Sequence, residues 1–178
     1  RMLAEARLMV RLYKSGLNIP VLYDCDIKEQ QLVMSNVPGR PLIELLNDDS
    51  IDDATMMKHL QSAGYSIRML HRQAIVHGDL STNNIMITPS GEAVLIDFGL
   101  AKIEFETELY GIDLHVLFEI LGASHPHREG AMEAVLQGYK QCEQDLGKAV
   151  KTPGGEPVCM EDVIERFDLI RTRVRYHG

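Results

Sequence analysis

The sequence predicts an α+β fold in which a small front layer of one helix and two strands precedes a larger, mainly helical body. Two observations predict it. The first is the cluster Val37-Pro38-Gly39-Arg40-Pro41, the strongest breaker sequence in the first half of the chain. The second is the series of amphipathic helical segments that follows this cluster. We therefore expect a boundary there, with the front layer at residues 1–37 and the body at residues 38–178.

The front layer begins with a helix over residues 2–14. Its apolar side chains are spaced toward one face, as in an amphipathic helix: Leu3, Ala6, Met9, Val10 and Tyr13. Gly16 follows the last turn, where a glycine commonly ends a helix. Residues 19–26 and 31–36 are then predicted to be two strands joined by a charged turn.

The body is expected to contain helices at residues 42–47, 51–73, 109–122, 128–143 and 160–174. The long helix carries a stripe of apolar or small residues at helical spacing: Ile51, Ala54, Met57, Leu60, Gly64, Ile67 and Leu70. Asp52 or Ser50 is suited to cap its first turn. Glycine and proline are frequent at residues 147–157, which indicates a loop.

The strongest functional signal follows the long helix. Residues 77–84 read His-Gly-Asp-Leu-Ser-Thr-Asn-Asn, and residues 97–99 read Asp-Phe-Gly. Between them, residues 85–88 and 93–96 are predicted to pair as a hairpin around a Pro-Ser-Gly turn. This hairpin would bring Asp97 back beside Asn84.

The two motifs in this order are typical of phosphoryl-transfer sites. Such a site requires a carboxylate beside the accepting hydroxyl or water, and magnesium to cover the phosphate charge. Asp79 is the candidate catalytic base, or the group that orients the acceptor. Asn84 and Asp97 are candidate Mg²⁺ ligands because their side chains offer the oxygen atoms that this cation prefers. The expected cofactors are ATP and Mg²⁺.

Composition limits the other possibilities. The chain of 178 residues is 45% hydrophobic, which is enough for a domain with a real core. Its net charge of −8 argues against a general nucleic-acid-coating protein. The three scattered cysteines have no metal-binding spacing, so we expect free thiols in a reducing compartment, cytoplasmic or nuclear. No stretch is long and apolar enough to cross a membrane, and the start at Arg1 indicates a piece of a longer protein.

Beyond these motifs, the chain resembles the C-terminal lobe of a eukaryotic-like protein kinase and, more narrowly, the small atypical kinases of the KEOPS/EKC complex, the PRPK family. Ala4-Glu5-Ala6-Arg7 is similar to that family's segment on the regulatory helix, and Gly78 stands where ordinary kinases have arginine. Asp97-Phe98-Gly99 leads almost at once to Gly111-Ile112-Asp113, with no Ala-Pro-Glu motif between them. The resemblance implies a kinase-like fold with a helical C-terminal lobe and a partial N-terminal lobe of the regulatory helix and two strands.

The resemblance also implies the nucleotide contacts. Glu5 would pair with a lysine that grips the phosphates, although neither that lysine motif nor a glycine-rich loop occurs in this chain. We therefore expect this stretch alone to be inactive. Met34 matches the gatekeeper position, which leaves the backbone of Ser35 and Val37 facing the adenine edge. Met86 would form the floor beneath the adenine, and the alternative is an ordinary core residue of the hairpin.

Other positions take their roles from the same resemblance. Asp113 would hold the catalytic loop through its backbone amides, and His77 would pack against that loop and hydrogen-bond it. Gly78 replaces the arginine that anchors an activation-loop phosphate, so we expect no activation by loop phosphorylation. Ser81 replaces the lysine that neutralises the transferring phosphate, which favours slow ATP hydrolysis over efficient protein phosphorylation.

The family also implies partners. Its members support the KEOPS threonylcarbamoyl-transferase subunit, which modifies tRNA, and they assemble with the other KEOPS subunits. Arg171, Arg173 and Arg175 resemble the family's short basic tail, and they are candidate contacts to tRNA phosphate or to an acidic groove on a partner. The alternative is a solvated helix end at which cations complement the helix dipole.

Two other functions stay open at this point. Small-molecule kinases of the aminoglycoside or choline type also use His-Gly-Asp in this loop, although the intact Asp-Phe-Gly motif and the lack of an obvious substrate domain speak against them. A pseudokinase that docks partners without chemistry would fit the missing glycine-rich loop. Such a scaffold has no need of Asp79, Asn84 and Asp97, so magnesium-dependent nucleotide binding separates it from an enzyme.

Overall fold

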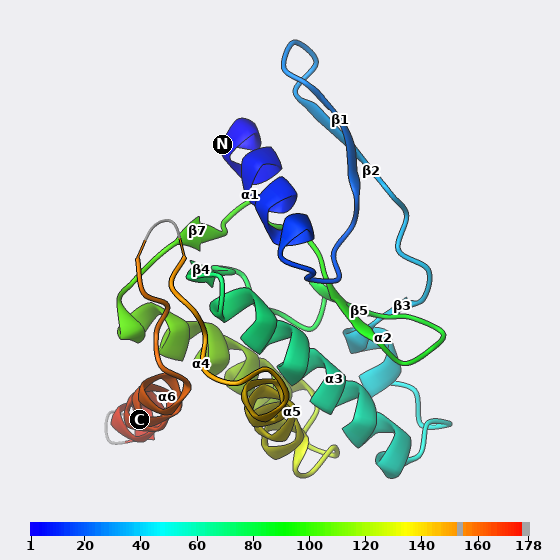
Figure 1. Ribbon diagram of the computed structural model, residues 1–178. Helices are drawn as coiled ribbons and strands as arrows, with labels where there is room; N and C mark the ends of the chain where they lie inside the picture. The colour runs from blue at the N-terminus through cyan, green and yellow to red at the C-terminus, as the bar shows by residue number, and fades with distance from the viewer. Residues whose placement is uncertain (153–154, 176–178) are drawn as a thin grey trace.

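The computed structural model of the chain describes residues 1–152 and 155–175. At one end of the molecule, α1 (Met2–Lys14) stands beside an extended hairpin made of β1 (Leu22–Asp26) and β2 (Gln31–Met34), as Figure 1 shows. The remaining helices gather at the other end (Figure 1). The predicted α+β fold, with a front layer of one helix and two strands and a mainly helical body, is confirmed.

The first helix has the predicted bounds, but its buried face differs from the predicted one. Ala6 and Met9 are buried with Leu8 and Leu12, whereas the other three expected positions are exposed: Leu3, Val10 and Tyr13. The apolar spacing of this helix is wide enough for two faces, and only the face toward the body is covered. The two predicted strands are present, pair antiparallel and are shorter than expected.

The helices predicted for the body are all present: α2 (Leu42–Leu46), α3 (Asp53–His71), α4 (Thr107–Ser124), α5 (Ala131–Leu146) and α6 (Met160–Arg175). Asp52, one of the two predicted caps, accepts a hydrogen bond from the Thr55 N–H at 2.9 Å. In the described ranges, no helix is long and apolar enough to cross a membrane.

The predicted stripe of α3 is wrong at its beginning. Ala54 is exposed and Met57 is only half-buried, because the first turn of α3 lies at the surface, where Asp53 pairs with the Arg128 guanidinium at 2.8 Å. The buried face starts at Met56 and continues as follows: Leu60, Ala63, Gly64, Ile67, Leu70 and His71.

The predicted hairpin is present as β5 (Ile85–Ile87) and β6 (Ala93–Leu95), paired antiparallel. The sequence does not predict three strands of two residues each: β3 (Arg40–Pro41), β4 (Ile75–Val76) and β7 (Lys102–Ile103). Two residues carry no periodicity that a pattern search can detect. β3 pairs with β5, and β4 pairs with β7. These pairings hold both ends of the loop at residues 77–84, which lies between β4 and β5.

α3 and α5 approach closely through two glycines. A Cβ added at Gly64 would overlap the Val135 carbonyl group, and a Cβ added at Gly138 would overlap the Gln61 carbonyl group. The backbones of the two helices therefore touch directly at both places. This contact positions the C-terminal end of α3, which leads into the catalytic loop.

Gly64→Ala and Gly138→Ala should each lower the free energy of unfolding by about 2 kcal/mol or more, because the facing carbonyl groups cannot retreat without separating the helices. Gly122→Ala is the matched control, since Gly122 lies in α4 with no atom within 4 Å of its added Cβ. It should leave stability unchanged or raise it by up to about 1 kcal/mol. Chemical denaturation measures all three, and equal stabilities would contradict the close packing of α3 on α5.

Candidate active site

The predicted catalytic loop, residues 77–84, lies between β4 and β5. Asp113 on α4 holds its start, because one carboxylate oxygen accepts the His77 N–H at 2.6 Å and the other accepts the Gly78 N–H at 3.0 Å. The His77 ring is buried, and its Nε2 donates to the Ile96 carbonyl group at 3.0 Å. The structural roles predicted for Asp113 and His77 are confirmed.

Asp79 and Asn84 are joined directly. The Asn84 Nδ2 donates to the Asp79 carboxylate at 3.1 Å and to the Asp79 carbonyl group at 2.9 Å. Asn84 is buried, whereas Asp79 is exposed. The Asp79 carboxylate is therefore oriented from one side and open to solvent on the other, which is the arrangement that a general base requires.

Asp97 follows the second strand of the hairpin. The Ile96 N–H donates to the Asn84 carbonyl group at 3.0 Å, so the hairpin returns the chain to Asn84 as predicted. Asp97 has a φ of 59°, a left-handed conformation that is uncommon outside glycine and is often found at functional sites. Its Oδ1 accepts the Gly99 N–H at 3.3 Å. The structure thus brings Asp79, Asn84 and Asp97 to the same end of the hairpin.

Glu5 on α1 lies on the same side of the molecule as Asp97. Both residues line a cavity of ≈ 660 Å³, together with Gly99 and Leu32. Burial raises the pKa of Glu5, the charge of Asp97 raises it further, and Arg1 opposes both effects. The Glu5 carboxylate therefore responds to Asp97, and it would be easier to ionise if a cation entered this cavity.

The positions expected to face adenine follow the end of β2. Met34 is the last residue of this strand, and its side chain is exposed. The Ser35 N–H donates to the Val21 carbonyl group at 2.8 Å, and the Ser35 Oγ accepts the Val21 N–H at 2.9 Å. Of the Ser35 backbone, the carbonyl group is what remains for a ligand.

Val37 lies shortly before β3 in the chain, and Met86 lies on β5, the strand that pairs with β3. Val37 is half-buried, and it lines a second cavity, of ≈ 520 Å³, together with Ser35. Met86 is also half-buried and pairs with Pro41 of β3. The β3–β5 pair therefore links the connection after β2 to the strand that follows Asn84.

The oxygen atoms of Asn84 and Asp97 suit Mg²⁺, which prefers hard oxygen ligands. Because the Asn84 Nδ2 is directed to Asp79, its Oδ1 is left for another partner. No group of three or more His, Cys, Asp and Glu side chains able to hold a metal is found among residues 1–152 and 155–175. Since Asn84 and Asp97 offer two ligands, phosphate oxygens and water would supply the others, as is common for magnesium–nucleotide sites.

Gly78 allows a contact that a residue with a side chain would prevent. Its φ is 79°, and a Cβ added there would lie 2.6 Å from the Leu100 carbonyl oxygen. The segment after Asp-Phe-Gly therefore packs directly on the catalytic loop. This segment is short, because α4 begins at Thr107.

The arginines of the C-terminal tail differ in their surroundings. Arg171 is half-buried, pairs with Asp168 at 2.9 Å and lies 5.8 and 5.7 Å from the ring centroids of two phenylalanines. Arg173 is exposed. The Arg175 side chain lies outside the described residues. Arg171 is therefore used within the fold, and Arg173 is the more accessible of the two described side chains.

Two residues beside the site are not indicated by any motif. The His71 Nε2 lies 3.3 Å from the Asp113 carboxylate, and the Tyr139 hydroxyl lies 2.8 Å from the His71 Nδ1. His71, Asp113 and Tyr139 come from three helices far apart in the sequence, and spacing does not connect them. The one available signal was a histidine on the predicted buried side of a helix, which requires a polar partner.

The comparisons with known proteins agree with this geometry. A family model described as the RIO domain matches residues 2–105, a range that includes the catalytic loop and Asp97. The chain is 35% identical over 153 residues to "KEOPS complex subunit Bud32" of Pyrococcus abyssi, and the match covers 85% of this chain and 68% of that protein.

Two further relatives carry related names. The chain is 32% identical to the "Probable bifunctional tRNA threonylcarbamoyladenosine biosynthesis protein" of Methanosarcina barkeri, over 97% of this chain and 27% of that protein. It is also 32% identical to "EKC/KEOPS complex subunit BUD32" of Gibberella zeae, over 79% of this chain and 60% of that protein. The matched region is thus between about a quarter and two thirds of the length of these relatives.

Gly78→Ala should disturb the contact between the catalytic loop and the segment after it. The Leu100 carbonyl group would have to move and the left-handed backbone would be strained, so we expect a loss of about 2–3 kcal/mol in the free energy of unfolding. Amide hydrogen exchange at Ala101, whose N–H donates to Phe98 at 3.0 Å, should become faster.

Gly91→Ala is the matched control for Gly78→Ala. Gly91 has a similar φ of 88°, but its added Cβ would meet only the His59 ring, at 3.6 Å. It should cost about 1 kcal/mol for backbone strain and leave exchange at Ala101 unchanged. Equal effects of the two substitutions on Ala101 would contradict the packed contact.

Proposed function

The chain belongs to the RIO domain family and to the Bud32 family, which are families of atypical kinases and ATPases, and on this premise we propose that it is the ATP-consuming subunit of a KEOPS complex. It transfers the terminal phosphoryl group of ATP to water or to a serine or threonine hydroxyl. This turnover supports the enzyme that makes threonylcarbamoyladenosine in tRNA, in line with the names of the relatives. Its place of action is the cytoplasm or the nucleus.

The observation that carries this proposal is the pair of hydrogen bonds from Asn84 to Asp79 within a loop that Asp113 holds. A loop that only links two strands has no need for the buried Asp113 carboxylate that holds its backbone, or for the Asp79 carboxylate that Asn84 orients. Catalysis does have that need, because rate depends on the position of the acting group to within a fraction of an ångström.

In the proposed reaction, the Asp79 carboxylate accepts the proton of the attacking hydroxyl or water. The attacking oxygen forms a bond to the γ-phosphorus while the bond to the bridging oxygen breaks, and ADP leaves. Asn84 keeps Asp79 in place through Nδ2, and its Oδ1 and the Asp97 carboxylate would hold Mg²⁺. The bound cation would neutralise charge on the phosphate oxygens. The Ser35 carbonyl group, Val37 and Met86 would surround the adenine, and Glu5 would face the phosphate side.

Hydrolysis of ATP is proposed to be faster than phosphorylation of proteins. Ser81 offers no positive charge to the transferring phosphate, and a cation at this position would otherwise stabilise its charge. Gly78 also stands at the position where an arginine would anchor a regulatory phosphate. Phosphorylation of Thr107, at the start of α4, is therefore expected to leave turnover unchanged.

Asp79→Asn in the full-length protein should lower ATP turnover by about 10²–10⁴-fold, because the amide cannot accept the proton. The KM for ATP should change little, since Asp79 is not among the residues proposed to bind the nucleotide. Asp49→Asn is the control, since Asp49 is exposed and distant in sequence from both motifs. Phosphate release with and without the KEOPS transferase subunit measures the effect.

The outcomes separate the three candidate functions. Parent-like turnover in Asp79→Asn would remove Asp79 from the mechanism. ATP consumption that appears only with an added amine or sugar would identify a small-molecule kinase. Absence of magnesium-dependent nucleotide binding by the full-length protein would identify a docking module without chemistry.

Arg173→Ala should weaken tRNA binding and reduce the slope of log K against log [salt] by about 1, because one phosphate contact is lost. Arg171→Ala should mainly lower stability, since Arg171 packs on two phenylalanine rings. Lys28→Ala, in the exposed turn between β1 and β2, is the control. An unchanged salt slope in Arg173→Ala would favour a solvated helix end over a tRNA contact.

A further inference from the structure

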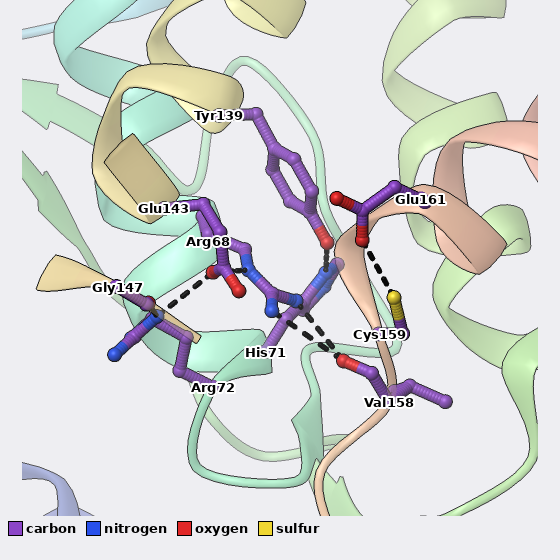
Figure 2. A network of polar contacts seen from close by, with 9 residues as sticks. All are labelled: Arg68, His71, Arg72, Tyr139, Glu143, Gly147, Val158, Cys159 and Glu161. Atoms are coloured by element: carbon purple, nitrogen blue, oxygen red, sulfur yellow. Dashed lines mark hydrogen bonds and ion pairs between the residues drawn. The ribbon is translucent and has the colours of Figure 1, made fainter. Parts of the chain in front are cut away.

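A buried chain of polar groups runs from α5 to the catalytic loop. The Tyr139 hydroxyl lies 2.8 Å from the His71 Nδ1, and the His71 Nε2 lies 3.3 Å from the Asp113 carboxylate. Tyr139 and His71 have no exposed surface, and Asp113 is 3% exposed. Figure 2 shows the Tyr139 hydroxyl directed at the His71 ring. Since Asp113 accepts the N–H groups of His77 and Gly78, this series of polar contacts ends at the backbone beside Asp79.

The positions of the protons in this chain follow from the charge of Asp113. Burial alone would raise the pKa of Asp113, but the hydrogen bonds from His71, His77 and Gly78 outweigh burial and hold the pKa below its ordinary value. The ionised carboxylate can only accept, so the His71 Nε2 must carry a proton. Burial lowers the pKa of His71 more than Asp113 raises it, so the ring is neutral and its Nδ1 is an acceptor.

Tyr139 supplies the donor that this acceptor requires. Burial raises the pKa of Tyr139, so its hydroxyl keeps its proton throughout the physiological range. The hydroxyl therefore donates to the His71 Nδ1. The opposite tautomer would place a lone pair of Nε2 against a lone pair of the Asp113 carboxylate, and it would leave a buried carboxylate with one hydrogen bond fewer.

We propose that His71 and Tyr139 are positioning residues for the reaction: the Tyr139 hydroxyl, by donating to Nδ1, holds the neutral His71 ring with its Nε2–H directed at Asp113, and that N–H keeps Asp113 in place beneath the catalytic loop. The kinetic part of this inference rests on the proposed ATP turnover. Its structural part, the location of one proton, does not.

The surroundings of Tyr139 hold its hydroxyl in the required direction. The Arg68 guanidinium lies 5.5 Å from the centroid of the Tyr139 ring, is fully buried and pairs with Glu143 at 2.9 Å. Arg68 also donates to the Val158 carbonyl group at 3.3 Å, and Arg72 pairs with the same Glu143 at 2.8 Å (Figure 2). These contacts join α3, α5 and the segment before α6 around the ring, so Tyr139 has little freedom to turn.

The charged and titratable groups that face His71 are few. Asp113 and Tyr110 face it from α4, Tyr139 from α5, Arg68 from its own helix and His77 from the catalytic loop. The Tyr110 ring meets the His71 ring edge to face at 4.8 Å between centroids, and its hydroxyl donates to the Glu104 carbonyl group at 2.6 Å. Tyr110 therefore does not compete with Tyr139 for the His71 Nδ1.

This assignment gives an unusual pH dependence to a variant without the hydroxyl. In Tyr139→Phe the His71 Nδ1 has no donor, so the ring is free to turn and its Nε2–H is no longer held toward Asp113. The neutral ring is no longer stabilised at Nδ1, so the pKa of His71 should rise relative to the parent protein. As the pH falls, the ring takes a second proton, and Nε2 then donates to Asp113 again. Activity lost at neutral pH should thus return in part at acidic pH.

The test uses the full-length protein and three variants. Tyr139→Phe should lower kcat for ATP hydrolysis at pH 7.5 by about 10-fold, the effect of one buried hydrogen bond, while the KM for ATP stays within about twofold. The ratio of variant to parent kcat should rise toward 1 between about pH 7.5 and 5.5. Tyr65→Phe is the matched control, because Tyr65 lies on α3 in a cavity that His71, Asp113 and Tyr139 do not line.

His71→Gln tests the same chain by replacement. A glutamine amide offers one N–H donor for Asp113 and one carbonyl acceptor for Tyr139, so kcat should stay near that of the parent. The ratio of variant to parent kcat should then not depend on pH. If His71 only contributed to stability, the kcat of Tyr139→Phe would not recover at low pH while the relative kcat of His71→Gln stayed independent of pH.

Nitrogen NMR of the histidine rings and amide exchange at Gly78 supply readouts that do not need activity. In the parent, His71 should show a protonated Nε2 and an unprotonated Nδ1. In Tyr139→Phe the Nδ1 resonance should shift because its hydrogen bond is lost, and Gly78 exchange should become faster, whereas Tyr65→Phe should match the parent. A parent His71 with its proton on Nδ1, or unchanged ring signals and Gly78 exchange in folded Tyr139→Phe, overturns the inference. If the parent instead binds and hydrolyses no ATP while the NMR pattern is as described, the proposed function fails and the proton assignment stands.

Discussion

Asp113 is a buried carboxylate, and the surrounding structure is arranged so that it stays ionised. An isolated charge in this position would be strongly destabilising, because burial removes its water. Two backbone N–H groups of the catalytic loop and one ring nitrogen replace that water. The loop therefore cannot leave Asp113 without exposing an uncompensated charge, and Asp113 cannot turn without releasing the loop. This mutual dependence fixes the backbone from which Asp79 projects.

The neighbouring contacts extend the same constraint in two directions. On one side, Gly64 and Gly138 bring α3 and α5 together, and this close approach places Tyr139 within hydrogen-bond distance of His71. On the other side, the Ile96 N–H and carbonyl group bind Asn84 and His77, which sets Asp97 beside the loop. Helix packing and hairpin register thus determine where Asp79, Asn84 and Asp97 lie.

The sequence was sufficient for the parts of this arrangement that are local. The helices and the β5–β6 hairpin follow from periodicity and turn residues, and the position of Asp97 next to Asn84 follows from the length of that hairpin. The faces of α1 and the first turn of α3 were not predicted correctly, because burial there depends on which neighbour covers the helix. The roles of His71 and Tyr139 depend on three helices meeting in space, and no spacing along the chain encodes that meeting. The boundary placed near residue 37 stays a prediction.

The most direct measurement is a crystal structure of the full-length protein with Mg²⁺ and a non-hydrolysable ATP analogue. We expect a magnesium ion bound by the Asn84 Oδ1 and the Asp97 carboxylate, with the γ-phosphate in reach of a water or hydroxyl that contacts Asp79. Asp113 should keep both loop hydrogen bonds in that complex. A nucleotide bound elsewhere, or a metal held without Asn84 and Asp97, would contradict the claim that Asp79, Asn84 and Asp97 form one phosphoryl-transfer site.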